Sequence, residues 1–512
     1  MKFYITTAIP YASKLPHVGN TYEAIFTDAV ARYHRLIGDD VFFLTGIDEH
    51  GQKIQRQAEA EGVSPQTLVD RVTGNLRETW DRCQVSYDRF IRTTDAGHKA
   101  IVSAIFKKLY AQDDIYKASY EGWYCTPDES FYTDSQAVKP PEGGADARLC
   151  PDCGRPLERT TEEAYFFRLS KYAPRLLEHI EQNPDFLVPE ARKNEMVNNF
   201  LKPGLQDLCV TRSTFTWGVP VEMDPGHVLY VWIDALSNYI TALGYHPDGS
   251  GELFQKNWPA DLHVVGKDIV RFHFLYWPCL LMALGLPLYK QLYGHGWFNM
   301  GTDKMSKSSG NVLYALDLAD IYGVDGLRYY LLREMPYSSD GSITPDLITA
   351  RYNTDLANDL GNLLSRTVAM VEKYCGPDLE TTESHPSVEA VRKAAIEGFV
   401  TGMDALKTQQ TLIEVWRLVD RCNKFIDETM PWALAKDPDK ADDLRAVMAT
   451  LCRALHTLTV LLTPILPETA DKMAAQLGLA PELRVWDSLQ TSDIRFRVQK
   501  GAALFPRLEK QG

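Results

Sequence analysis

The sequence predicts an α/β fold with a parallel sheet, followed by a bundle of helices. Strand-like runs alternate with helical runs over residues 1–114, which is typical of parallel α/β sheets. The alternation resumes at residue 226, after a segment rich in Pro, Gly and charge. From residue 351 onward, apolar residues recur at three- and four-residue spacing, which indicates packed amphipathic helices.

The first α/β segment explains where a ligand would bind. Apolar runs at residues 2–9 and 39–47 predict strands, and amphipathic runs at 23–37 and 77–91 predict helices. A strand followed by a turn and a helix places the turn at residues 8–20 at the carboxyl end of a sheet strand. Open α/β sheets bind their ligands at this edge.

Residues 115–225 are predicted to be an irregular insertion. Cys150 and Cys153 are separated by two residues, which is half of a zinc knuckle. Upstream, Cys125 supplies a third thiol, and Asp128 stands where a fourth is expected; zinc also accepts carboxylate oxygen. Two interpretations stay open: a structural zinc ion bound by these four residues, or a knuckle that has lost its metal.

The second α/β segment covers residues 226–297, with a strand-like run at 261–270 and an apolar helix at 271–285. A connecting region at 298–350 leads to the helical part at 351–512, in which we expect no strands. The clearest amphipathic runs of the helical part are residues 351–374, 411–430 and 441–466.

Composition sets limits on location and partners. A chain of 512 residues, 45% of them hydrophobic, can bury a large core. The net charge of -14 disfavours indiscriminate binding to nucleic acid but leaves room for a local basic surface. Nine cysteines are too few for a disulfide scaffold. The N-terminus does not resemble a signal peptide and no apolar run is long enough to span a bilayer, so we expect a cytoplasmic protein without a membrane partner.

Two short segments point to polyphosphate chemistry. Lys304 and Lys307 lie three residues apart in the segment GTDKMSKSSGN, whose small residues cannot shield one ammonium group from the other. A polyphosphate between them would turn this repulsion into attraction. In the turn after the first strand, His17 can donate a hydrogen bond to a phosphate near a helix N-terminus, and Gly19 allows close approach to the backbone.

These segments carry a family resemblance. PHVGN at residues 16–20, followed by KMSKS at 304–308, resembles the signature pair of class I aminoacyl-tRNA synthetases. The strings FFLTGIDEHGQKI, VWIDAL, HVVGKDIVRFHFLYWP and MPWALAK are similar to methionyl-tRNA synthetases, in the same order and over nearly the whole chain. One position departs from the family pattern: Asn20 stands where the first signature usually ends in His. Because Asn cannot carry charge, His17 should contribute more of the phosphate contact.

The resemblance implies a Rossmann-type catalytic domain split by a connective insertion with a zinc knuckle, and then an α-helical anticodon-binding domain. It implies activation of methionine by ATP to methionyl-adenylate and pyrophosphate, then transfer to the 3′-terminal ribose of tRNA(Met). The implied domains are catalytic halves at 1–114 and 226–297, the insertion at 115–225, the KMSKS loop and stem-contact region at 298–350, and the anticodon-binding domain at 351–512.

Site residues follow from the resemblance, position by position. The implied catalytic residues are His17, Asn20, Lys304 and Lys307, with Lys307 as the main stabiliser of the transition state. ATP, with Mg²⁺ bridging its phosphates, would contact His17, Gly19, Asn20, Gly266, Lys267, Asp268 and Lys307. Methionine would bind among Ile9, Tyr11, Asp48, Trp232, Ala235, Leu236, Tyr239, Ile269 and His273, with Asp48 pairing its ammonium group. The anticodon would meet Asn362, Arg366 and Trp432, the last as a stacking platform.

Other classes of protein share parts of this pattern. A small nucleotidylyltransferase has a similar first turn but needs neither the helical part nor the knuckle. A tRNA-binding descendant of a synthetase could lose the lysines, which are present here. The synthetases for valine, isoleucine and leucine carry a large editing domain, for which residues 115–225 leave no room. We expect a monomer, because the chain ends soon after the helices without the β-barrel that some relatives append. The resemblance implies both initiator and elongator tRNA(Met) as partners.

Overall fold

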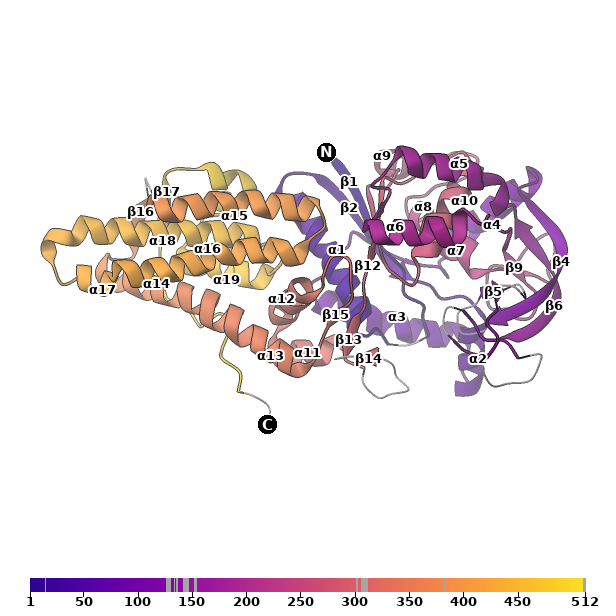
Figure 1. The fold of residues 1–512 in the computed structure, drawn as a ribbon, viewed down its shortest axis with the longest axis horizontal. Helices are drawn as coiled ribbons and strands as arrows, with labels where there is room; N and C mark the ends of the chain where they lie inside the picture. The colour runs from indigo at the N-terminus through magenta and orange to yellow at the C-terminus, as the bar shows by residue number, and fades with distance from the viewer. Residues whose placement is uncertain are drawn as a thin grey trace.

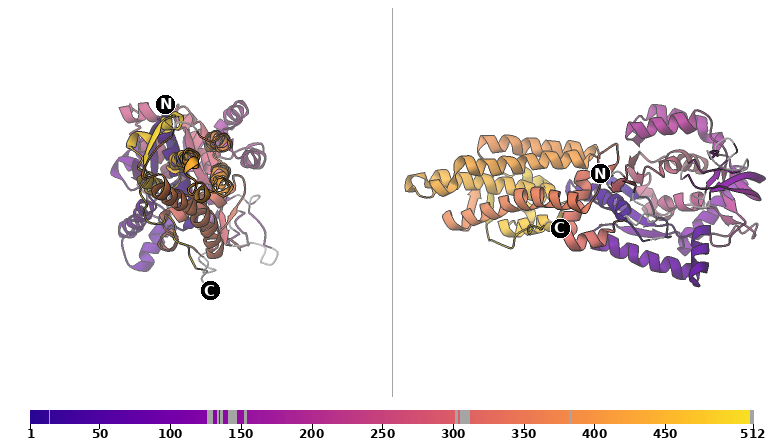
Figure 2. Two further views of the ribbon diagram at one scale, coloured as in Figure 1. Left: turned by 90° about the vertical axis from the view of Figure 1, so that its left-hand side faces the viewer. Right: turned by 60° about the horizontal axis from the view of Figure 1, so that its bottom comes forward.

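The structure is a computed structural model in which two parts lie end to end (Figures 1 and 2). An α/β part occupies one end and a bundle of long helices occupies the other. The right-hand view of Figure 2 shows the same elongated shape, and the left-hand view looks along its long axis from the end of the bundle. The structure describes residues 1–13, 15–125, 130–132, 134, 137–140, 147–151, 154–300, 303–304, 312–381 and 384–509.

A six-stranded sheet forms the centre of the α/β part, in the order β3-β2-β1-β11-β12-β7, and all neighbouring strands are parallel. The order reverses between β1 and β11, which makes their carboxyl ends the switch point of the sheet. The last four residues of β1 are buried, as expected of a central strand covered on both faces. The strands are β1 (Lys2–Thr7), β2 (Asp40–Ile47), β3 (Arg89–Arg92), β7 (Leu187–Val188), β11 (Leu262–Gly266) and β12 (Gln291–His295).

Helices connect these strands, and one predicted helix ends early. The helix predicted over 77–91 is wrong beyond Arg82, because α3 ends there and β3 begins at Arg89. Gln84 has a φ of 59°, a left-handed conformation that a helix cannot continue through. The helices before and after this turn are α1 (Val18–Leu36), α2 (Gln52–Glu61), α3 (Pro65–Arg82) and α4 (Ala96–Ala111).

The segment predicted to be irregular contains an ordered antiparallel sheet in the order β5-β4-β6-β8. Its long hairpin pairs Ile115 with Phe167 at one end and Tyr124 with Glu158 at the other. The same segment then sends β7 back to the edge of the central sheet. Its elements are β4 (Ile115–Cys125), β5 (Ser130–Tyr132), β6 (Glu158–Phe167), α5 (Leu169–Gln182), β7, α6 (Glu190–Met196), η1 (Val197–Leu201), β8 (Leu208–Cys209) and β9 (Thr211–Arg212).

After the insertion the chain completes the central sheet and then adds a small second one. In the order β14-β13-β15, this three-stranded sheet follows directly on β12. The elements are β10 (Val228–Leu229), α7 (Val231–Leu236), α8 (Asn238–Thr241), α9 (Glu252–Asn257), η2 (Phe272–Tyr276), α10 (Trp277–Leu284), β13 (Phe298–Met300), β14 (Asp303–Lys304), α11 (Ala315–Tyr322), α12 (Val324–Glu334) and β15 (Gly341–Ser342).

The C-terminal part is helical, as predicted, except for one two-stranded ribbon. The prediction that it has no strands is wrong, because β16 (Asp378–Thr381) pairs with β17 (Ile494–Arg497). Its helices are α13 (Pro345–Arg351), η4 (Tyr352–Gly361), α14 (Asn362–Tyr374), α15 (Pro386–Asp404), α16 (Thr408–Thr429), α17 (Pro431–Leu434), η5 (Pro438–Lys440), α18 (Ala441–Leu462), α19 (Pro467–Leu477), η6 (Pro481–Leu483) and η7 (Trp486–Gln490). Among the described residues, only the helical stretch Pro438–Leu462 is long and apolar enough to cross a membrane, and 83% of its apolar window is buried inside the protein.

A buried arginine joins the two parts. Arg328 on α12 donates from Nη2 to Oδ2 of Asp28 on α1 at 2.7 Å. It also donates from Nε to the carbonyl of Ile465, in the turn between α18 and α19, at 2.9 Å. Burial alone would raise the pKa of Asp28, but its interactions with Arg328, Arg32 and Ser86 outweigh this and hold the pKa below its usual value. This carboxylate therefore stays charged and fixes α1 against the bundle.

Candidate active site

The candidate site lies at the switch point of the sheet, where the segments after β1 and β2 remain paired beyond the last strand residues. The amide of Asp48 donates to the carbonyl of Pro10 at 2.9 Å, and the amide of Ala12 donates to the carbonyl of Asp48 at 2.8 Å. These bonds set Tyr11 directly beside Asp48. The structure thus brings together two residues that the resemblance assigns to the methionine pocket.

Backbone contacts set the orientation of His17 at the start of α1. Its Nδ1 accepts a hydrogen bond from the amide of Gly19 at 3.0 Å, and its own amide donates to Oδ1 of Asn20 at 3.3 Å. Because Nδ1 accepts, the proton of the neutral ring resides on Nε2, which leaves Nε2 as the donor. A Cβ on Gly19 would lie 2.9 Å from Cε1 of His17, so this ring position requires glycine.

The residues predicted to contact ribose and phosphate follow β11. Gly266 ends the strand, and a Cβ there would lie 2.6 Å from Oδ1 of Asp268. Asp268 is exposed and accepts a hydrogen bond from Nε1 of Trp297 at 3.0 Å. Lys267 forms an ion pair with Asp340, with Nζ 2.7 Å from Oδ1. Both partners, Trp297 and Asp340, were missed from the sequence.

Most of the apolar residues predicted to bind methionine lie in two adjoining clusters. Ala235 belongs to a small cluster with Tyr230, while Leu236 and Tyr239 belong to the large core of the α/β part. Ile9 and Trp232 pack against both clusters and therefore lie between them. Ile269 packs against the large core, and the ring of Trp232 stacks on Phe272 with centroids 3.5 Å apart.

Tyr239 and His273 form a buried polar pair among these apolar residues. Nδ1 of His273 lies 2.9 Å from the carbonyl of Ile269, which can only accept, so Nδ1 carries the proton. Nε2 of His273 therefore accepts from the hydroxyl of Tyr239, at 2.7 Å. Burial lowers the pKa of His273 to about 4 and raises the pKa of Tyr239. The ring is neutral at pH 7 and presents no positive charge to a bound ammonium group.

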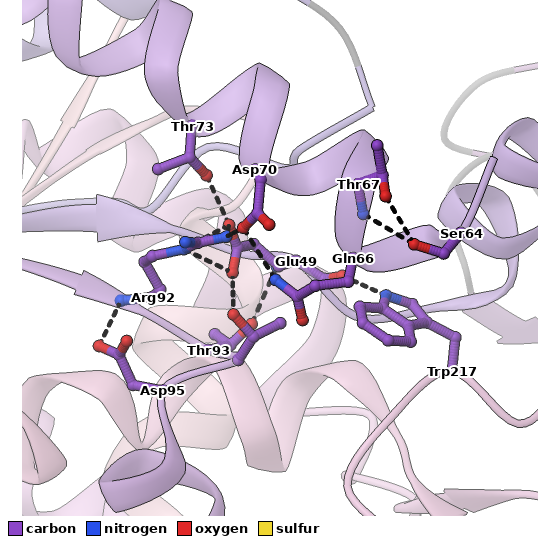
Figure 3. Close-up of polar contacts among 11 residues, drawn as sticks. Glu49, Ser64, Gln66, Thr67, Asp70, Thr73, Arg92, Thr93, Asp95 and Trp217 are labelled. Atoms are coloured by element: carbon purple, nitrogen blue, oxygen red, sulfur yellow. Dashed lines mark hydrogen bonds and ion pairs between the residues drawn. The ribbon is translucent and has the colours of Figure 1, made fainter.

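A network of hydrogen bonds fixes the backbone beside Asp48 (Figure 3). The buried carboxylate of Glu49 accepts from Nε of Arg92 at 2.9 and 3.0 Å and from the hydroxyl of Thr73 at 2.5 Å. The amide of Glu49 donates to Thr93 at 2.9 Å, and the hydroxyl of Thr93 lies 3.4 Å from Oδ1 of Asp48. Glu49 is thus turned away into the protein, while Asp48, only 5% exposed, directly follows β2 at the site.

A second buried network links the two sides of the pocket. Oδ2 of Asp234 lies 2.6 Å from Nδ1 of His50, and its Oδ1 lies 2.7 Å from Nε2 of His98. Burial would raise the pKa of Asp234, but the interactions with His50 and His98 prevail and lower it. Asp234 lies on α7 between Trp232 and Ala235, so this carboxylate ties the helix of the pocket to the segment after β2.

The second signature is described only in part. Lys304 lies in β14, paired with Asn299 of β13, whereas Lys307 lies outside the described residues. The hairpin that begins at β13 follows the end of β12 by two residues, so it starts at the same edge of the sheet as the site.

The three residues predicted to meet an anticodon lie in the helical part. Asn362 begins α14, and Nη2 of Arg366 on the same helix lies 3.0 Å from Oδ1 of Asp427. Trp432 on α17 is 39% exposed, which is unusual for so large an apolar side chain. Figure 1 shows α17 at the end of the bundle farthest from the sheet.

The predicted zinc knuckle is also only partly described. Cys125 and Cys150 are buried in one small cluster, and Sγ of Cys150 lies 3.4 Å from the hydroxyl of Tyr132. Asp128 and Cys153 lie outside the described residues. Within the part of the chain that the structure describes, no three His, Cys, Asp or Glu side chains are grouped to hold a metal.

No pattern in the sequence predicts the networks around the site. His50 and Asp234 are 184 positions apart, and Lys267 and Asp340 are 73 apart. Neither spacing matches a local motif, so only the folded chain reveals these pairs. His50 stands in the quoted string FFLTGIDEHGQKI, which marked its neighbourhood without indicating its partner.

The sheet order and the switch-point site fit a class I tRNA synthetase, and the family described as "tRNA synthetases class I (M)" matches residues 3–368. The chain is 53% identical to the methionine–tRNA ligase of Clostridium tetani, over 99% of this chain and 78% of that protein. It is 51% identical to the methionine–tRNA ligase of Bacillus subtilis, with the same coverage. The chain belongs to the methionine–tRNA ligase family.

Solved structures agree with this assignment. Mycobacterium tuberculosis methionyl-tRNA synthetase in complex with methionyl-adenylate superposes with a TM-score of 0.93 at 40% identity, covering 99% of this chain and 100% of that chain. The free state of the same protein gives a TM-score of 0.86 at 37% identity, covering 99% and 98%. The family resemblance inferred from the signature strings is confirmed.

Proposed function

We propose that this chain is a ligase that activates methionine with ATP and transfers it to tRNA(Met). The observation that carries the proposal is the switch-point site in a chain about half identical to methionine–tRNA ligases over its full length. The M. tuberculosis relative was solved with methionyl-adenylate, the product of the first step. In that step a carboxylate oxygen of methionine attacks the α-phosphorus of ATP, and the bond to pyrophosphate breaks.

Methionine would bind between the segment after β2 and α7. Asp48 supplies the negative charge for its α-ammonium group, and the pairing with Tyr11 holds that carboxylate at the site. Its thioether would pack among Ile9, Ala235 and Leu236, and sulfur also packs well against aromatic edges. Those edges would come from Tyr11, Trp232 and Tyr239, with Ile269 and His273 completing the slot. The neutral state of His273 supports this assignment, because it leaves the pocket uncharged at the thioether.

ATP would bind across the ends of β1 and β11. The Nε2–H of His17 would donate to a phosphate, because Nδ1 accepts from the Gly19 amide. Oδ1 of Asn20 accepts from the His17 amide, so the side-chain nitrogen of Asn20 would be the donor to a phosphate. Gly19 keeps the backbone at this turn accessible, and Asp268 would accept from ribose hydroxyls beside Gly266 and Lys267. Lys304 and Lys307 would stabilise charge on the departing pyrophosphate. Mg²⁺, when bound to the phosphate oxygens of ATP, would neutralise part of their charge.

In the second step the terminal ribose hydroxyl of tRNA attacks the carbonyl carbon of the adenylate, and AMP leaves. Asn362, Arg366 and Trp432 would bind the anticodon, and the exposed indole of Trp432 supports this proposal because bases stack on such surfaces. A face that reads CAU would accept initiator and elongator tRNA(Met) alike. We expect the chain to act as a cytoplasmic monomer, and light scattering tests the oligomeric state.

The insertion would hold a structural zinc ion through Cys125, Asp128, Cys150 and Cys153. The burial of two of these thiols in one cluster supports the donor set. The measurement is zinc content of the purified chain: one ion per chain, lost in Cys150→Ser, is expected. Zinc far below one ion per chain would favour the knuckle that has lost its metal.

The experiment that tests the function is amino-acid-dependent exchange of labelled pyrophosphate into ATP, run without tRNA. Each standard amino acid is supplied in turn with Mg²⁺. Exchange driven chiefly by methionine is the expected result. Exchange with another amino acid would keep the mechanism and discard the pocket assignment. No exchange from folded protein would favour an RNA-binding descendant without catalysis.

Lys307→Ala separates chemistry from binding. We expect the rate of exchange to fall about 100-fold or more, because a positioned donor to the transition state is lost. Methionine affinity, measured by equilibrium dialysis, should change little. An equal loss of methionine binding would indicate misfolding instead of lost transition-state stabilisation.

A further inference from the structure

A cluster of side chains lies between the end of β11 and the small sheet that carries the second signature. Its members are Lys267, Asp268, Trp297 and Asp340. Nζ of Lys267 lies 2.7 and 2.8 Å from the two carboxylate oxygens of Asp340. The same ammonium group lies over the ring of Trp297, 4.1 Å from its centroid. Asp340 is therefore the anchor that fixes where the Lys267 side chain points.

Asp340 also binds the start of the hairpin. Its Oδ1 accepts from the backbone amide of Trp297 at 3.0 Å, and its Oδ2 lies 3.4 Å from Nδ2 of Asn299. The next residue, Gly341, pairs with Phe298 of β13. One carboxylate thus contacts the residue before β13 and the middle residue of β13, and Asn299 in turn pairs with Lys304 of β14.

The backbone is shaped for this contact. A Cβ on Gly296 would lie 2.2 Å from the carbonyl oxygen of Ser339 and 3.0 Å from Oδ1 of Asp340. Only glycine permits the link between β12 and β13 to approach the segment before β15 so closely. Two stretches of chain more than forty positions apart therefore meet at this carboxylate.

The cluster ends at the carboxylate that the proposed function assigns to ribose. Nε1 of Trp297 donates to Oδ1 of Asp268 at 3.0 Å. This bond holds one carboxylate oxygen, so the indole sets the orientation of the Asp268 carboxylate. The chain of contacts is continuous: Asp340 holds the backbone of Trp297 and, through Lys267, its ring, and Trp297 holds Asp268.

We propose that Asp340 is a positioning residue for ATP, which orients Lys267 and, through Trp297, the ribose-binding carboxylate of Asp268 relative to the hairpin that carries the second signature. The inference rests on the proposed function for the role of Asp268 and Lys267. Asp340 would act through Lys267 and Trp297 and would not touch the substrate itself. Its loss should therefore weaken ATP use and leave methionine binding unchanged.

Asp340→Asn tests this role, since it keeps the shape of the side chain and removes its charge. We expect the KM for ATP in pyrophosphate exchange to rise about ten-fold, with the KM for methionine within about two-fold of wild type. The matched control is Asp224→Asn. Asp224 pairs with Lys117 at 2.8 Å and is 27% exposed, against 28% for Asp340, and lies in the insertion. The control should leave both KM values unchanged.

Trp297→Phe supplies an independent variant, because it keeps a ring beneath Lys267 and removes the bond to Asp268. We expect the KM for ATP to rise about three-fold, and the double variant with Asp340→Asn to lose less than the product of the two single effects. Independent, multiplying effects would overturn the proposed chain of contacts. A lower KM for ATP in Asp340→Asn would also overturn it, because Asp340 would then sequester Lys267.

Binding of ATP alone, measured by equilibrium dialysis, distinguishes failure of this inference from failure of the proposed function. If wild type binds ATP but shows no methionine-dependent exchange, the function is wrong and the affinity ratio of the variants still decides the role of Asp340. An ATP affinity equal to that of Asp224→Asn would overturn it. A melting temperature far below that of Asp224→Asn, with both KM values raised together, would show a structural role only.

Discussion

The imidazole of His17 receives its orientation from its own helix. The amide of Gly19 donates to Nδ1, and so the other ring nitrogen becomes the donor. In the proposed ATP site, such a ring would meet a phosphate without first changing its tautomer, which would reduce the reorganisation on binding. The arrangement depends on the missing side chain of Gly19, since a Cβ there would lie 3.0 Å from Nδ1.

Gly19→Ala should displace the ring. We expect kcat/KM for ATP in pyrophosphate exchange to fall between about 10- and 100-fold, because small misplacements of a catalytic group are costly. The control is Gly74→Ala in the middle of α3, where a Cβ would meet no atom within 4 Å. That change should raise the free energy of unfolding by up to about 1 kcal/mol and leave exchange unaltered. Equal activity of the two variants would contradict the role of Gly19.

At the level of single residues, the sequence predicted the pieces of the site that lie in short strings. His17, Asp48 and Asp268 were assigned through strings that follow strands, and the structure places each of them at the carboxyl edge of the sheet. Their partners could not be predicted. Asp340 stands after a helix and before a two-residue strand, in a stretch whose local pattern indicates only a turn. Its role depends on tertiary contacts that no local spacing encodes.

Among the elements, α18 shows how a core helix controls its polar side chains. His456 lies within α18, 1% exposed, and its Nε2 lies 2.8 Å from the carbonyl of Leu483 in η6. Burial lowers the pKa of His456 to about 4 despite this hydrogen bond. The ring is therefore neutral in the folded protein at pH 7, and it joins α18 to the segment that covers it.

The pH dependence of stability follows from this shift. An unfolded histidine has a pKa of about 6.5, so between pH 6.5 and 4 the unfolded state binds the proton and the folded state does not. The contribution of such a histidine to the free energy of unfolding is fully present above pH 6.5 and is lost as the pH drops toward 4. For a shift from about 6.5 to about 4, as for His456, the loss approaches about 3 kcal/mol.

His456→Gln should reduce this loss of stability at acid pH. The measurement is the urea midpoint between pH 7 and 4.5, in which the variant should lose less stability than wild type over the same interval. His246, whose side chain is 43% exposed, supplies the control, and His246→Gln should keep the wild-type slope. An unchanged slope in His456→Gln would show that the group does not titrate with a lowered pKa.

The elements also show where sequence patterns fail. The amphipathic helices of the C-terminal part were predicted well, because a buried face repeats along each of them: α16 spans Thr408–Thr429 where residues 411–430 were expected. The hairpin of β4 and β6 was not predicted, since Pro, Gly and charged residues dominate the stretch between its strands. Pairing with a distant strand, rather than local composition, makes these residues a sheet.

For the whole molecule, the contact between α1 and the bundle connects the α/β part, which carries the candidate site, to the helical part, which carries Trp432. Arg328 lies fully buried at this contact and uses its guanidinium to bind one carboxylate and several backbone carbonyls. A buried guanidinium with this many partners can be replaced only at high cost.

Arg328→Met should lower the free energy of unfolding by about 3–5 kcal/mol, because it leaves the buried Asp28 with a weaker counterion. The control is Arg82→Met, which removes an exposed pair with Asp320 and should leave the free energy of unfolding nearly unchanged, because solvent screens such pairs. Urea unfolding followed by circular dichroism measures both. A loss in Arg328→Met no larger than that of the control would show that the pair does not stabilise the contact.

The elongated shape predicts that tRNA recognition and methionine activation can be separated. Trp432→Ala at the far end of the bundle should raise the KM for tRNA(Met) about ten-fold in charging assays, since one stacked base is worth about 1–3 kcal/mol. Pyrophosphate exchange should be unaffected. Val485→Ala, which changes another exposed apolar residue of the helical part, is the control and should affect neither reaction. Slowing of exchange by Trp432→Ala would contradict this division of labour.

The return of the insertion to the central sheet has a consequence for how this architecture can be altered. β7 pairs with the outer side of β12, so one strand of the insertion belongs to the central sheet. Deleting the whole insertion would remove the strand that pairs with β12. The backbone amides and carbonyls exposed on β12 could then pair with another molecule. A trimmed version of this chain should therefore retain Leu187 and Val188 with their flanking turns, even where everything else in the insertion is dispensable.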